Sequence, residues 1–128
     1  MQSAQEGKIT TFHLGPWEEE IGYSQSVRVG NRIIVSGTVG DDSISKDTES
    51  QLKDAYQTII TTLAHDGANL KNVIREMIYC RDMDALIKCQ DLRKKFYDGH
   101  LPASTWVQVE RLYLPGHLVE IEVEAILF

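Results

Sequence analysis

Glutamate alternates with apolar residues near the end of the chain, at Glu120, Glu122 and Glu124. In an extended strand this period of two places all three carboxylates on one face. The simplest interpretation is a solvated face, because carboxylates are rarely buried without a partner. If a neighbouring subunit covered that face, a glutamate with an altered pKa could position or activate water as a general base.

Other reactive residue types show no catalytic or metal-binding spacing. The sequence contains no phosphate-binding loop, no dinucleotide fingerprint and no G-x-S-x-G elbow, so we expect no cofactor. Arg93-Lys94-Lys95 forms a local basic cluster that could be a solvated helix face or a phosphate contact. We expect no metal site, because metal-ligand spacing is absent among the four histidines, which are His13, His65, His100 and His117.

The composition is that of one globular domain over residues 1–128. A net charge of −6 and a pI near 5.1 argue against a nucleic-acid partner, because such partners favour basic domains. Apolar runs are too short for a membrane span, and residues 1–8 lack the apolar stretch of a signal peptide. We expect a cytoplasmic protein with Cys80 and Cys89 reduced.

Periodicity predicts an α+β fold with the element order β-β-β-α-β-α-β-β. Apolar residues recur every three or four positions along one helix that starts at Asp47 or Thr48 and ends at Gly67. A second helix is predicted from Asp82 or Asp84 to Asp98, and the segment 17–20 is predicted to be an acidic loop. The six predicted strands, which form a single mixed sheet with two helices on one face, cover residues 8–14, 23–29, 32–39, 73–80, 104–112 and 117–128.

The second face of this sheet predicts self-association. Along residues 73–80 we place Val73, Met77 and Tyr79 on one face, and the other face then carries Ile74, Ile78 and Cys80. Two helices cover only one face, and an exposed apolar sheet face exceeds what soluble monomers usually tolerate. Closed symmetry among identical subunits is the usual solution.

Several segments together resemble the Rid (YjgF-like) family. These segments span nearly the whole chain, and they are residues 21–31, Val35-Ser36-Gly37, Gly67-Ala68 with Leu70 and Val73, Leu101-Pro102-Ala103-Ser104-Thr105 with Val107, and 119–126. The resemblance implies a chorismate-mutase-like fold, a homotrimer with a barrel-like core, and a small-molecule metabolite bound in clefts between subunits. Many members hydrolyse enamines or imines derived from amino acids, such as 2-aminoacrylate, without a cofactor.

The resemblance also assigns residues. It places substrate-binding positions at Tyr23 and Gly37 and the water-orienting glutamate at Glu122. Ser104 stands where the family has an arginine that binds the substrate carboxylate, and a serine hydroxyl is too short and uncharged to replace it. Trp106 stands where a cysteine is common, and Gln90 where an asparagine is common. The cleft is therefore expected to be more aromatic and less suited to a small carboxylate.

Three functions remain open from the sequence. The first is a hydrolase similar to 2-iminobutanoate/2-iminopropanoate deaminase, in which Arg28 or Arg111 could supply the missing cation. The second is a non-catalytic trimer that binds or senses a metabolite, favoured by Ser104 and Trp106. The third, ranked last because of the acidic balance, is an endoribonuclease that uses the basic cluster.

Overall fold

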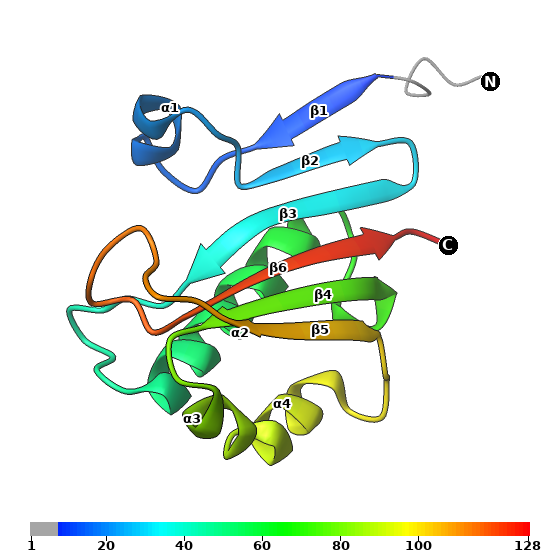
Figure 1. The fold of residues 1–128 in the computed structure, drawn as a ribbon. Helices are drawn as coiled ribbons and strands as arrows, with labels where there is room; N and C mark the ends of the chain where they lie inside the picture. Colours follow the sequence, from blue (N-terminus) through cyan, green and yellow to red (C-terminus); the bar gives the residue numbers. More distant parts are fainter. Residues whose placement is uncertain (1–7) are drawn as a thin grey trace.

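A computed structural model describes residues 8–128, so the segment 1–7, where the sequence predicts no signal peptide, lies outside the described part. Six strands form one sheet in the order β1-β2-β3-β6-β4-β5 (Figure 1). Neighbouring strands are antiparallel except for the parallel pair β4–β5, so the predicted mixed sheet is confirmed. The strands are β1 (Ile9–Phe12), β2 (Ser26–Val29), β3 (Arg32–Val39), β4 (Val73–Cys80), β5 (Ala103–Gln108) and β6 (Val119–Ile126).

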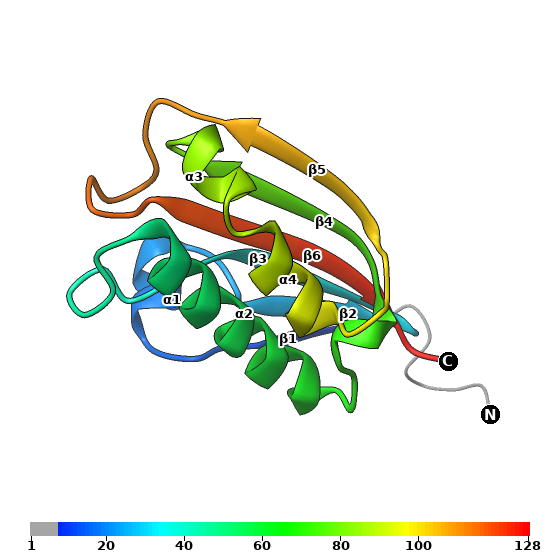
Figure 2. The ribbon, with the colours of Figure 1, turned by 90° about the horizontal axis from the view of Figure 1, so that it is seen from below.

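Helices α2, α3 and α4 lie together on one face of this sheet (Figure 2). The helical segments are α1 (Trp17–Ile21), α2 (Thr48–His65), the 3₁₀ turn η1 (Leu70–Asn72), α3 (Met83–Ile87) and α4 (Gln90–Tyr97). This arrangement confirms the predicted α+β architecture with helices on one face. Within residues 8–128, no helix has the length and apolarity needed to cross a membrane.

The apolar stripe of α2 forms the centre of the core. The side chain of Asp47 caps this helix by accepting a hydrogen bond from the Ser50 backbone at 2.7 Å. Gly67 follows the helix with a φ of 77°, a left-handed conformation that glycine adopts without strain. The buried stripe packs onto the sheet through Leu52, Ala55, Tyr56, Ile59 and Leu63.

Two helix predictions need correction. The segment beginning at Trp17 is not a loop but the short helix α1, because buried Glu18 anchors it and Gly22, at φ 110°, ends it. The predicted long second helix is divided into α3 and α4, with a break at Lys88 and Cys89. Asp82 caps α3 by accepting a hydrogen bond from the Ala85 backbone.

The predicted assignment of β4 side chains to the two faces of the sheet is wrong for Val73 and Ile74. Val73 is fully buried, as are Ile78 and Cys80, whereas Ile74 is 43% exposed. The pairing of β4 with β6 shifts register between Val73 and Arg75, and this bulge reverses the alternation before the regular part of the strand. Beyond the bulge, Met77 and Tyr79 share one face, as predicted, and this face is the one opposite the helices.

Two strands are shorter than predicted. Strand β5 ends at Gln108 and β6 begins at Val119, so residues 109–118 form a connecting loop instead of strand ends. Arg111 donates hydrogen bonds to the carbonyl groups of Leu112 and Tyr113, both at 3.1 Å. These local contacts hold a turn, which prevents the segment from extending the sheet.

Candidate functional site

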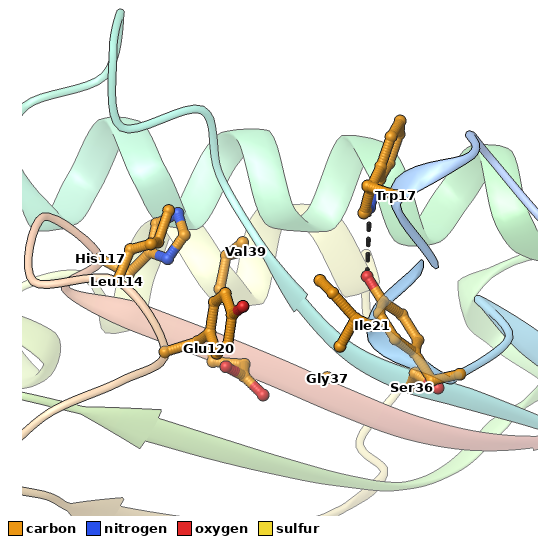
Figure 3. Close-up of a pocket in the computed structure, with 10 residues that line it drawn as sticks. Trp17, Ile21, Ser36, Gly37, Val39, Leu114, His117 and Glu120 are labelled. Atoms are coloured by element: carbon orange, nitrogen blue, oxygen red, sulfur yellow. Dashed lines mark hydrogen bonds between the residues drawn. The ribbon is translucent and has the colours of Figure 1, made fainter. Parts of the chain in front are cut away.

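A cavity of about 620 Å³ lies at the end of the sheet where α1, β3, β6 and the 109–118 loop meet (Figure 3). Its size is typical of small-molecule sites. The lining is mostly aromatic and aliphatic, and it consists of Trp17, Ile21, Tyr23, Ser36, Gly37, Val39, Tyr113, Leu114, His117 and Glu120. The structure therefore brings together two of the predicted binding residues, Tyr23 and Gly37.

The carboxylate of Glu120 lies directly against Gly37. A Cβ atom built on Gly37 would collide with this carboxylate and would lie 3.2 Å from its Cγ. The glycine occurs where the pairing of β3 with β6 shifts register between Val35 and Thr38. Burial raises the pKa of Glu120, His117 acts to lower it, and the charge of Glu122 adds to the increase.

Trp17 and Tyr23 form one aromatic wall of the pocket. The indole Nε1 of Trp17 donates a hydrogen bond to the Tyr23 hydroxyl at 3.2 Å (Figure 3). The buried carboxylate of Glu18 fixes this segment by accepting backbone hydrogen bonds from Leu14 at 3.0 Å and Gln25 at 3.1 Å. Glu18 therefore binds the backbone at both ends of the segment 14–25, which carries Trp17 and Tyr23.

Glu18→Ala should destabilise this segment. The substitution removes the acceptor of the Leu14 amide and one of the two acceptors of the Gln25 amide, which also donates to the Phe12 carbonyl at 2.9 Å. Each lost hydrogen bond to a charged group contributes about 1.5–3 kcal/mol. We expect the free energy of unfolding to fall by about 2–4 kcal/mol in urea titrations. The control is Glu19→Ala, because Glu19 is exposed on the same helix and should change stability by less than about 0.5 kcal/mol. Equal effects of the two substitutions would contradict the anchoring role.

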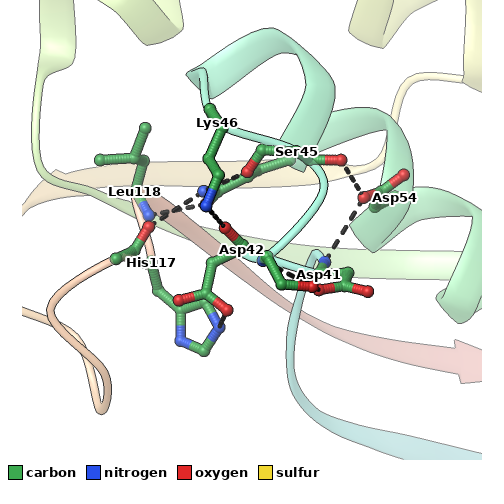
Figure 4. A network of polar contacts seen from close by, with 10 residues as sticks. Asp41, Asp42, Ser45, Lys46, Asp54, His117 and Leu118 are labelled. Carbon is green, nitrogen blue, oxygen red and sulfur yellow. Dashed lines mark hydrogen bonds and ion pairs between the residues drawn. The ribbon is translucent and has the colours of Figure 1, made fainter.

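His117 is positioned at the opposite end of the pocket by a polar network (Figure 4). Its Nε2 lies 3.8 Å from Asp42 Oδ1. Buried Gln51 joins the 40–47 loop to the start of β6, because its amide donates to the Ser45 and Gly116 carbonyls at 3.0 Å each. The same amide accepts a hydrogen bond from the Leu118 backbone at 2.7 Å.

Glu122 lies on the same face of β6 as Glu120 but outside the lining of the cavity. It accepts a hydrogen bond from the Tyr79 hydroxyl at 2.5 Å. This hydrogen bond, together with burial, raises the pKa of Tyr79. Within one chain, the glutamate predicted to orient water is therefore next to the pocket and held by a tyrosine.

Ser104, Trp106 and Gln90 are not brought to this pocket within one chain. Strand β5 is the edge strand opposite β1, and Ser104 pairs with Glu76, whose side chain is buried beneath the helices. The Ser104 hydroxyl donates to the Glu76 carboxylate at 2.8 Å, and Trp106 Nε1 donates to the Ser104 oxygen at 2.9 Å. Gln90 is exposed at the start of α4.

Glu76 is the centre of a buried network beside β5. Tyr56 and Tyr97 each donate a hydroxyl hydrogen bond to its carboxylate at 2.8 Å. Arg93 binds the same carboxylate with two guanidinium nitrogens and lies 5.7 Å from the Trp106 ring centre. Burial acts to lower the pKa of Arg93, but the charge of Glu76 and the hydrogen bonds to it outweigh burial and raise the pKa. Arg93 is therefore not part of a solvated basic face.

Neither of the two arginines considered as substitutes reaches the pocket lining. Arg28 donates to the Gly30 carbonyl at 2.9 Å and pairs with Asp66 at 3.5 Å. Arg111 is held by carbonyl groups of its own loop. Among the described residues that line the cavity there is no lysine or arginine.

Several residues of the pocket were not identified from the sequence. Glu120 was recognised only as one of the alternating glutamates, and His117 was given no role in a small-molecule site. Trp17 was noted only as an aromatic residue in a loop. The alternation of glutamates was a usable signal for Glu120, whereas the placement of His117, Tyr113 and Leu114 depends on the loop conformation.

Comparisons with known proteins agree with this fold. The family model described as Endoribonuclease L-PSP matches residues 17–127. The crystal structure of a YjgF/YER057c/UK114 family member from Mycobacterium tuberculosis matches with a TM-score of 0.87 and 32% identity, covering 94% of this chain and 100% of that chain.

Curated relatives cover most of the chain as well. An uncharacterised protein of Streptomyces coelicolor is 33% identical over 117 residues, which cover 86% of this chain and 85% of that protein. A 2-iminobutanoate/2-iminopropanoate deaminase of Mus musculus is 31% identical over 109 residues, 81% of this chain and 80% of the mouse protein. The chain therefore belongs to the Endoribonuclease L-PSP family, the group of YjgF or Rid-like α+β proteins.

Proposed function

We propose that this chain is a Rid-type small-molecule protein that hydrolyses an imine or enamine in the cavity at the end of its sheet. The observation that carries the proposal is the juxtaposition of Tyr23, Gly37 and a half-buried carboxylate, Glu120, in an aromatic cavity of about 620 Å³. The similarity to the mouse deaminase supports this reaction class. The substrate would be a small metabolite, and the residues require no cofactor for hydrolysis.

The proposed reaction adds water across a C=N bond. One water attacks the imine carbon, the proton that it loses is taken up by a carboxylate, and proton transfer to nitrogen then releases ammonia and leaves a carbonyl product. We propose that Glu122 orients this water, as the family resemblance implies. Its hydrogen bond from Tyr79 supports this role, because it fixes the carboxylate on the face of β6 that continues from the pocket.

A coupled assay tests this function. Imines are generated in situ either from threonine by a dehydratase or from a primary amine by an amine oxidase, and ammonia release is followed with and without the protein. We expect acceleration with at least one imine and a loss of about 100-fold or more in Glu122→Gln, which is typical of removing a general base.

The control for this assay is Glu124→Gln. Glu124 lies on the same strand and face but pairs with Arg32, so the variant should retain the rate. Full activity in Glu122→Gln would reject the role of this residue. No acceleration with either imine would reject catalysis altogether.

A non-catalytic metabolite-binding protein is the second candidate. It is supported by the absence of lysine and arginine among the described residues of the cavity and by the engagement of Ser104 with Glu76. Ligand-induced thermal shifts with recovery of unchanged ligand would favour this candidate. RNA cleavage ranks last, because Arg93 of the basic cluster is paired with buried Glu76 and the chain carries a net charge of −6.

We also propose that the protein is a homotrimer in which the face of the sheet opposite the helices is buried. This face carries apolar side chains that are partly exposed in one chain, including Ile34 at 45%, Ile74 at 43% and Val107 at 37%. In such a trimer, β5 of a neighbouring subunit would bring Ser104 and Trp106 towards the cavity. The site would then lie between subunits.

A further inference from the structure

The cavity has an unusual charge pattern for a protein related to enzymes that act on amino-acid derivatives. Among the described residues that line it, Glu120 supplies the one carboxylate and His117 the one imidazole. The remaining lining residues are aromatic, aliphatic or small. A substrate carboxylate would therefore face a carboxylate, and like charges in a partly buried site repel each other.

Five of the six arginines make contacts elsewhere in the chain, and the sixth, Arg75 on β4, lies outside the lining of the cavity. Arg32 pairs with Glu124, Arg93 with Glu76 and Arg28 with Asp66. Arg81 and Arg111 donate to backbone carbonyl groups. Recruiting one of these arginines to a ligand would break a contact that the fold already makes.

We infer that the cavity selects a ligand that carries a positive charge on nitrogen next to an apolar or aromatic group, and that Glu120 is the residue that recognises the charge. The ligand class is a primary amine or its protonated imine without a carboxylate. This inference rests on the proposed small-molecule function of the same cavity, and it names the substrate class.

The geometry of Glu120 supports this role. Its carboxylate lies against Gly37, where the missing side chain leaves room for it beside the strand. Burial raises the pKa of Glu120 because it disfavours the ionised carboxylate. A bound ammonium or iminium group would stabilise the ionised form by pairing with it. A neutral ligand would give no such compensation.

The aromatic walls support the same ligand class. Trp17 is linked to Tyr23 by a hydrogen bond at 3.2 Å, and Tyr113 lies in the same lining. Aromatic faces attract cations, while Ile21 and Leu114 offer contact area to an apolar group. A ligand with a charged nitrogen and an apolar tail would match both parts of the cavity.

Calorimetric titration with three matched probes tests the inference. The probes share a phenyl group on a three-carbon chain and differ in charge: 3-phenylpropylamine is cationic, 3-phenylpropanol is neutral and 3-phenylpropionate is anionic. We expect the amine to bind at least about tenfold more tightly than the alcohol, as one charge-assisted contact implies, and the acid to bind most weakly. In Glu120→Gln the amine should lose this advantage while the alcohol binds as before.

Glu124→Gln provides the matched control, because it removes the same charge from the same face of β6 and should keep the preference for the amine. The inference is overturned if the acid binds as tightly as the amine, if the preference survives Glu120→Gln, or if none of the probes binds at millimolar concentration. Binding is measured without turnover. A protein that prefers the amine but accelerates neither imine in the coupled assay would keep this inference and lose the proposed hydrolysis.

Discussion

Arg93→Met should lower the free energy of unfolding by about 3–5 kcal/mol, the range found when one partner of a buried ion pair is removed. The side chain of Glu76 is fully buried, and that of Arg93 is only 12% exposed. Without the guanidinium group, the carboxylate would keep three hydroxyl donors, from Tyr56, Tyr97 and Ser104, but no opposite charge. Methionine retains much of the length of the arginine side chain, so the decrease in the free energy of unfolding comes mainly from the loss of the positive charge.

Chemical denaturation of three variants separates charge from packing. Arg93→Met gives the full loss, and Lys95→Met serves as the control because Lys95 is exposed on the same helix. The double variant Glu76→Gln/Arg93→Met should recover at least half of the loss, because a neutral amide can still accept the tyrosine hydroxyl groups. A loss below about 1 kcal/mol in Arg93→Met would show that this ion pair contributes little to stability.

Ile34→Asp should convert the proposed homotrimer into monomers at micromolar concentration. Ile34 lies on the face opposite the helices and pairs across the sheet with Glu124. A buried aspartate at this position would have no partner and would face another carboxylate, which costs several kcal/mol for each subunit. We therefore expect the dissociation constant to rise by at least about 100-fold, corresponding to about 3 kcal/mol.

Sedimentation velocity measures this change, and Ile87→Asp is a close control. Ile87 on α3 is 45% exposed, the same fraction as Ile34, but it lies in the helical layer. The control variant should remain trimeric. A wild-type protein that sediments as a folded monomer, or an Ile34→Asp variant that stays trimeric, would reject assembly through this face of the sheet.

Local sequence patterns predicted most of the elements because their physical causes are local. The stripe of α2 recurs with the helical period, and the Gly30-Asn31 turn joins β2 to β3 through a two-residue loop. The errors occur where a non-local contact decides the structure. Helix α1 exists because Glu18 binds amide groups on both sides of it, and the faces of β4 change at a bulge that depends on its pairing with β6.

The candidate site was only partly predictable for the same reason. Tyr23, Gly37 and the alternating glutamates could be selected from the sequence, and the structure places the first two in one cavity. Which of Glu120 and Glu122 lines the cavity depends on which of them lies against Gly37. That alignment is set by the register of β3 against β6, and a short sequence pattern carries no information about register across the sheet.

By itself, the sequence determined the α+β class, the order of the six strands with α2 between β3 and β4, and the alternation that directs Ile121 and Val123 into the core and the glutamates to the other face. These features follow from side-chain period and polarity, which act over a few residues. Only the tertiary structure decided that Glu120 and His117 share a cavity with Trp17, and that Ser104 is bound to Glu76 at the far edge of the sheet. Strand order and loop closure bring these residues together or keep them apart, and both result from packing between segments that are distant in the chain.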